Sequence, residues 1–71
     1  MNEFFNTKTR RVKILEEMKL IGSIVNKKYL SEKFNVSERT IERDIKELIV
    51  KGNSIRIISG RNGGYILTFT E

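Results

Sequence analysis

The spacing of the apolar residues changes at about Asn53, and this change limits the folds that the chain can adopt. Before Asn53, apolar residues recur every three or four positions, which is the period of a helix that is buried on one side. After it come two short runs, at about 54–59 and 65–69, that are rich in β-branched and aromatic residues and favour strands. The glycine-rich segment 60–64 between these runs favours a hairpin turn. We therefore expect an α+β fold that is mainly α, with a C-terminal β-hairpin.

Three helices are expected before the hairpin, because each helical stretch follows a residue that can accept hydrogen bonds from the first-turn amides. Their ranges are about 8–20, 27–34 and 38–51. Their expected N-caps are Thr7, Asn26 and Ser37. Gly22 and Gly52 follow the first and third helices and can adopt the left-handed conformation that ends a helix. A short β-favouring piece, 23–25, lies between the first two helices.

One side of each expected helix is apolar, and together these sides predict the core. The predicted core residues are Val12, Ile14, Leu15, Met18, Leu30, Phe34, Ile41, Ile45, Leu48 and Ile49. The first six residues show no clear period, so we expect a loosely ordered tail at 1–6. A length of 71 residues suits one domain, which we place at 1–71.

The composition argues against catalysis and against a membrane location. The chain contains no Cys and no His, so it lacks a thiol, the commonest transition-metal ligand and the commonest general base near neutral pH. No apolar run approaches the roughly 20 residues of a membrane-spanning helix, and the first residues do not resemble a signal peptide. We expect a cytoplasmic protein that is not an enzyme and uses no metal, cofactor or small-molecule ligand.

The net charge favours a polyanionic partner. Fourteen Lys and Arg residues outnumber nine Asp and Glu residues, which gives a net charge of +5. In a short chain this excess is typical of nucleic-acid binding, although a basic surface without an anionic ligand would show the same balance.

Basic residues gather on the side of the third helix that lies opposite its apolar stripe. At 100° per residue, Arg39, Arg43 and Lys46 fall together there, with Thr40 on one flank. Two helices joined by a tight turn, here 35–37, describe a helix-turn-helix motif, whose second helix enters the major groove of DNA. We therefore predict that Arg39 and Arg43 contact base edges.

Other polar residues are predicted to contact phosphate. Ser37, Thr40 and the free amides stand at the start of the third helix, whereas Lys27 and Lys28 stand in the first turn of the second helix, where they oppose the helix dipole. The tip of the hairpin carries Arg61, which could enter a minor groove or bind the backbone. A basic cluster at 8–13 would add further contacts. The predicted DNA-binding residues are Lys27, Lys28, Ser37, Arg39, Thr40, Arg43, Lys46 and Arg61.

Two alternatives stay open on these observations. The third helix could form the pairs Glu42–Lys46 and Arg43–Glu47, which suit an ordinary solvated face. The same surface could also bind a partner chain, which would make the domain a protein–protein interaction module.

Three segments, in the right order, resemble the winged helix-turn-helix domains of bacterial regulators. Residues 36–48 (VSERTIERDIKEL) resemble the recognition-helix pattern VS-x-RTI-x-RDI-x-x-L of deoR-like and biotin-repressor-like domains, including those at the head of WYL-domain regulators. Residues 29–35 (YLSEKFN) resemble the scaffold helix LAEKFGV of that family. Residues 60–67 (GRNGGYIL) resemble its wing, GRxGGYxL. Ser31 and Asn35 stand where the family often has Ala and Gly.

The resemblance implies a winged helix that binds double-stranded DNA as a transcriptional regulator or as its DNA-binding module. Helix 38–51 would lie in the major groove, with a recognition role for Arg39, Thr40 and Arg43. The wing tip 60–64 would reach an adjacent groove or the backbone. Two copies, as a homodimer, are expected on a repeated or palindromic site. Family members usually continue into a sensor domain, and no such domain follows within the 71 residues.

Overall fold

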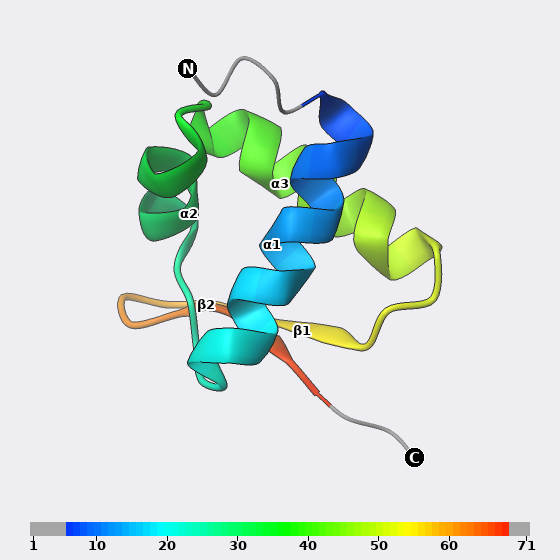
Figure 1. Ribbon diagram of the computed structural model, residues 1–71. Coiled ribbons are helices and arrows are strands. Elements are labelled where there is room, and N and C mark those ends of the chain that lie inside the picture. The colour runs from blue at the N-terminus through cyan, green and yellow to red at the C-terminus, as the bar shows by residue number, and fades with distance from the viewer. Residues whose placement is uncertain (1–5, 69–71) are drawn as a thin grey trace.

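The computed structural model describes residues 6–68, which form three helices followed by a two-stranded antiparallel sheet. In chain order the elements are α1 (Thr7–Ile21), α2 (Lys27–Phe34), α3 (Glu38–Val50), β1 (Ile55–Ile58) and β2 (Gly64–Leu67). Figure 1 shows the three helices grouped together, with α1 crossing in front of α3, the hairpin below them and the hairpin tip extending to one side. This arrangement confirms the predicted winged helix-turn-helix fold.

The helix ends are those predicted from capping residues, with one exception. The side chains of Asn26 and Ser37 cap α2 and α3 as predicted. Helix α1 is capped by Asn6, whose side chain accepts a hydrogen bond of 2.8 Å from the amide of Thr9, so the prediction of Thr7 was wrong. Both residues are good caps, but Asn is the stronger one. Asn6 belongs to the predicted tail 1–6, and the rest of that tail lies outside the described residues.

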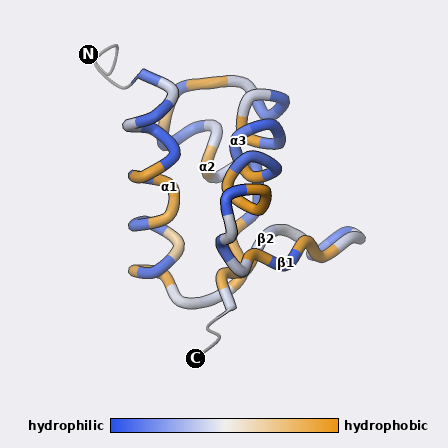
Figure 2. The backbone as a smooth tube through the Cα atoms, turned by 90° about the vertical axis from the view of Figure 1, so that its right-hand side faces the viewer, coloured by the Kyte–Doolittle hydropathy of each residue, from blue (hydrophilic) through white to orange (hydrophobic). Residues whose placement is uncertain are grey.

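The core lies between the three helices and the inner side of the hairpin. Its buried apolar residues are Ile14, Met18, Val25, Leu30, Phe34, Ile41, Ile45, Leu48, Ile55 and Tyr65. Figure 2 shows apolar residues alternating with hydrophilic ones along α1 and α3. Val12 was wrongly placed in the core, because its side chain is 50% exposed. The i, i+4 pair of Ile14 and Met18 forms the buried face of α1, and Val12 lies off that face.

The hairpin is attached to the helices through the segment before α2. Strand pairing aligns Ile55 with Leu67. Val25 and Tyr65 then exchange two backbone hydrogen bonds of 2.9 and 2.8 Å, so the predicted β piece 23–25 is reduced to a single bridge. A Cβ atom on Gly64 would lie 2.6 Å from the carbonyl oxygen of Val25, and only glycine allows this approach. The predicted end of the second strand, Phe69, lies outside the described residues.

Candidate nucleic-acid interface

The turn between α2 and α3 fixes the two helices of the motif. Asn35 ends α2 in the left-handed conformation, with φ of 57°. Its short polar side chain tolerates that conformation, which most side chains do not. The amide of Val36 donates to the carbonyl of Ser31 at 3.0 Å, and Ser37 then caps α3. This local chemistry places the start of α3 at the surface, with its outer face free of the core.

The outer face of α3 is basic, as predicted. Arg39, Arg43 and Lys46 are exposed, and together with Glu42 they line one open hollow on this helix. Within residues 6–68, no ion pair joins Glu42 with Lys46 or Arg43 with Glu47. Among the described residues, Arg39, Arg43 and Lys46 form no ion pair, and they lie next to one another on the outer face of α3.

Glu42 is instead paired with a residue of another helix. Its Oε2 atom accepts a hydrogen bond from the ammonium group of Lys27, in the first turn of α2. The pair is about half exposed, with 42% of the Lys27 side chain and 46% of the Glu42 side chain accessible. The hydrogen bond from Lys27 lowers the pKa of Glu42, and the same contact raises the pKa of Lys27. Lys27, which was predicted to contact phosphate, thus has a carboxylate partner within the protein.

A second hollow separates the hairpin from the starts of α2 and α3. Lys28 of α2 and Arg61 of the hairpin line it, and Ile57 and Tyr65 contribute apolar surface. Arg61 lies at the hairpin tip and is exposed. The tip extends beyond the helices in both views of the chain (Figures 1 and 2). The structure thus brings three of the predicted phosphate contacts, Lys27, Lys28 and Arg61, to one cleft.

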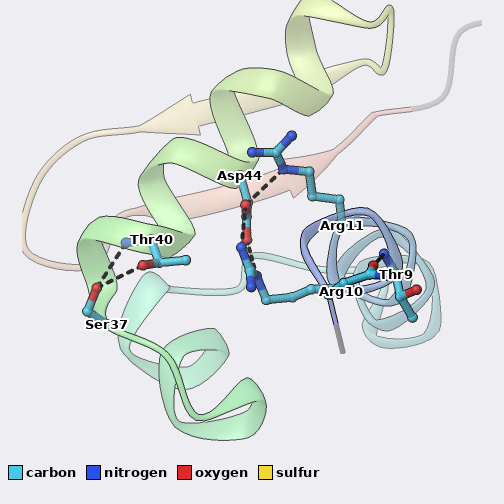
Figure 3. A network of polar contacts seen from close by, with 7 residues as sticks. Thr9, Arg10, Arg11, Ser37, Thr40 and Asp44 are labelled. Carbon is cyan, nitrogen blue, oxygen red and sulfur yellow. Dashed lines mark hydrogen bonds and ion pairs between the residues drawn. The ribbon is translucent and has the colours of Figure 1, made fainter. Parts of the chain in front are cut away.

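The hydroxyl groups at the start of α3 are partly engaged within the protein. Ser37 Oγ accepts a hydrogen bond of 3.1 Å from the amide of Thr40, and the two hydroxyl oxygens lie 3.1 Å apart (Figure 3). A hydroxyl group can both donate and accept. The pair therefore keeps hydrogen-bonding capacity at the exposed end of the helix.

The sequence did not reveal that Asp44 is buried. Its side chain is fully inaccessible, and its carboxylate accepts hydrogen bonds from two arginines of α1 (Figure 3). Arg10 donates through Nε at 2.5 Å and through Nη2 at 3.0 Å, and Arg11 donates through Nε at 2.8 Å. Asp44 lies three residues after Ile41 and four before Leu48, and this helical spacing was the available signal.

This arrangement corrects the predicted role of the basic cluster 8–13. Arg10 and Arg11 turn inward to Asp44 and are mostly buried. Lys13 pairs with Glu16 on the same helix. Arg10 and Arg11 therefore stabilise the packing of α1 against α3.

The helices α2 and α3, the tight turn between them and the following hairpin define a winged helix-turn-helix domain. Comparison with known families agrees, because a family model described as an HTH domain matches residues 10–66. The chain belongs to this family of helix-turn-helix DNA-binding domains, of the deoR-like and biotin-repressor-like type. The match does not extend to the predicted resemblance to domains at the head of WYL-domain regulators. Comparisons with curated proteins and with solved structures gave no match.

The described residues offer neither a membrane-spanning helix nor a metal-binding cluster. Within residues 6–68, no helix is long and apolar enough to cross a membrane. The same residues contain no group of three or more acidic side chains that could hold a metal ion.

Proposed function

We propose that this domain binds duplex DNA in a sequence-specific manner, with α3 in the major groove, as the DNA-binding module of a transcriptional regulator. One observation carries the proposal: Arg39, Arg43 and Lys46 are exposed on the outer face of the second helix of the motif, and none of them forms an ion pair with another of residues 6–68. Guanidinium groups bind guanine O6 and N7 in a bidentate manner. Arg39 and Arg43 are therefore the proposed base contacts.

The remaining predicted residues would hold the backbone of the DNA. Lys28 and Arg61 both line the cleft between α2 and the hairpin, which a phosphate backbone beside α3 could occupy. Ser37 and Thr40 stand at the N-terminal end of α3, where free amides favour an anion. Arg61 would bind the backbone or enter an adjacent minor groove. Lys27 is close enough to join them, but its ammonium group is shared with Glu42.

One such module makes few base contacts, so two copies are proposed to bind a repeated or palindromic site. Selection of bound sites from a random duplex library would test this proposal directly. The enriched sequences would contain two half-sites with a fixed spacing. Enrichment of a single half-site would remove the homodimer from the proposal.

A salt series measures the electrostatic part of binding. If roughly five phosphates are neutralised, the slope of log affinity against log salt should be about −4 to −5. Arg39→Ala and Arg43→Ala should weaken the preference for particular bases, whereas Lys28→Ala should weaken binding to all duplexes alike. Absence of binding at low salt would overturn the proposed function.

The basic character of the α3 face also separates DNA binding from the alternative of a protein-interaction module. A protein-interaction face is expected to be mostly apolar at its centre, whereas the outer face of α3 carries Arg39, Arg43 and Lys46.

A further inference from the structure

An acidic side chain lies on the basic face of α3. Glu42 lines the same hollow as Arg39, Arg43 and Lys46, and about half of its side chain is accessible. A carboxylate in this position would repel the phosphates of a bound duplex. Its presence on the proposed DNA-binding face therefore requires a specific role or a compensating charge.

Lys27 supplies the compensating charge. Its ammonium group pairs with Oε2 of Glu42 across the gap between α2 and α3. Lysine in the first turn of a helix opposes the helix dipole, and α2 has no acidic residue in that turn. The partner of Lys27 lies instead on α3. This contact orients the Glu42 carboxylate in the DNA-free protein.

The hydrogen-bonding capacity of the held carboxylate is not exhausted. Lys27 occupies Oε2, and Oε1 of Glu42 has no hydrogen-bond partner within residues 6–68. An ionised carboxylate only accepts hydrogen bonds, and the contact with Lys27 keeps the pKa of Glu42 below its ordinary value. Glu42 is thus a fixed acceptor on the surface that would face the major groove.

The major groove contains few donors for such an acceptor. Cytosine presents its N4 amino group, whereas guanine and thymine present acceptors, which a carboxylate repels. Adenine presents a donor at N6 beside an acceptor at N7, which suits an amide better than a carboxylate. The best partner for a carboxylate in this groove is cytosine.

We propose that Glu42 determines specificity by accepting a hydrogen bond from cytosine N4, and that Lys27 positions its carboxylate for this contact. The inference rests on the proposed function, because it requires α3 to enter the major groove. It assigns Lys27 a role through Glu42 in place of a direct phosphate contact.

Site selection with the full chain and with Glu42→Gln tests the first part. Glutamine has nearly the same shape but carries a donor and an acceptor, the pattern that matches adenine. We expect one position in each half-site to change from cytosine to adenine, with a change of about tenfold in the preference, while the other positions stay the same. Identical selected sites for the two proteins would overturn the role of Glu42.

Lys27→Met tests the positioning role, with Lys28→Met as the matched control. Lys28 is the next residue of α2 and forms no ion pair within the described chain. We expect Lys27→Met to weaken the cytosine preference several-fold, and to do so only when Glu42 is present, so that it has no such effect in the Glu42→Gln background. Lys28→Met should lower affinity for every duplex alike and leave all base preferences unchanged.

A contrary result for Lys27→Met would be equally clear. If it lowers affinity for all duplexes alike, leaves the cytosine preference intact and reduces the salt slope by about one, Lys27 is a phosphate contact and not a positioning residue. If the domain does not bind DNA in a sequence-specific manner, the result is different, because the unaltered protein would then select no site at all. Circular dichroism of each variant establishes that it is folded.

Discussion

Helix α3 forms ion pairs on two sides, and the two sites differ in burial. Towards α1, the carboxylate of Asp44 is fully buried and accepts three hydrogen bonds from Arg10 and Arg11. Towards α2, the pair of Lys27 and Glu42 is about half exposed. Removal of one partner from a buried pair leaves an uncompensated charge, whereas exposed pairs contribute little to stability. The difference separates a site that maintains the fold from one that is accessible to a ligand.

Asp44→Asn should have the largest effect on stability. The substitution leaves two mostly buried guanidinium groups without their carboxylate, which should lower the free energy of unfolding by about 3–5 kcal/mol. Urea unfolding followed by circular dichroism would measure it. Glu42→Gln, which neutralises a half-exposed carboxylate on the same helix, is the matched control and should lose far less stability than Asp44→Asn. A loss below about 1 kcal/mol for Asp44→Asn would show that the buried site is not a major determinant of the fold.

The two arginines of the buried site should contribute unequally. Arg10 donates two hydrogen bonds to Asp44 and Arg11 donates one. Because a hydrogen bond to a charged group contributes about 1.5–3 kcal/mol, Arg10→Met should destabilise by about 3 kcal/mol and Arg11→Met by about 2 kcal/mol. Thermal unfolding of the two variants, compared at equal pH and salt, gives the order. Equal losses of stability would mean that the two arginines contribute equally to the site, whatever the number of hydrogen bonds that each donates.

The exposed pair should give a small dependence of stability on pH. The folded state lowers the pKa of Glu42 from its ordinary value of 4.5, mainly through the hydrogen bond from Lys27. The folded state therefore binds the proton less tightly than the unfolded state, and the contribution of Glu42 is present above pH 4.5 and is lost as the pH falls through the lowered pKa. The small difference in stability between the unaltered protein and Glu42→Gln should therefore shrink as the pH falls below 4.5. A difference that grows on acidification would contradict this assignment.

Lys27→Met should have the smallest effect on stability. It removes an exposed ion pair, but it also removes a positive charge from the first turn of α2, where such a charge opposes the dipole. These opposing effects should leave the midpoint of urea unfolding unchanged, while site selection shows an altered base preference. A marked loss of stability together with unchanged base preference would instead place this pair with Asp44, as a part of the fold.

The sequence predicted the features of this domain that depend on residues close to one another in the chain. The caps Asn26 and Ser37, the buried stripe of α3 and its basic outer face follow from helical spacing and were confirmed. Both ion-pair sites were missed, because they join residues that are far apart in the chain. The number of charges in α3 could be counted, but their partners depend on how α1 and α2 pack against it.

Asp44 illustrates this limit. Its helical spacing places it beside the buried stripe, yet a lone carboxylate there would be strongly unfavourable. Only the approach of α1 supplies the two guanidinium groups that make burial acceptable. The predicted DNA-binding residues, which lie on the surface, stay predictions that the binding experiments test.

The backbone bridge between Val25 and Tyr65 has a consequence for how the hairpin opens. A two-stranded hairpin is marginally stable alone, and this bridge joins it to the segment that leads into α2. The amide hydrogens of Val25 and Tyr65 should therefore exchange with solvent together, in the same opening event as the helical core. The amide of Arg61, at the exposed tip, should exchange much sooner. The base of the wing would then keep its direction for as long as the helices stay folded, while its tip remains free to adapt.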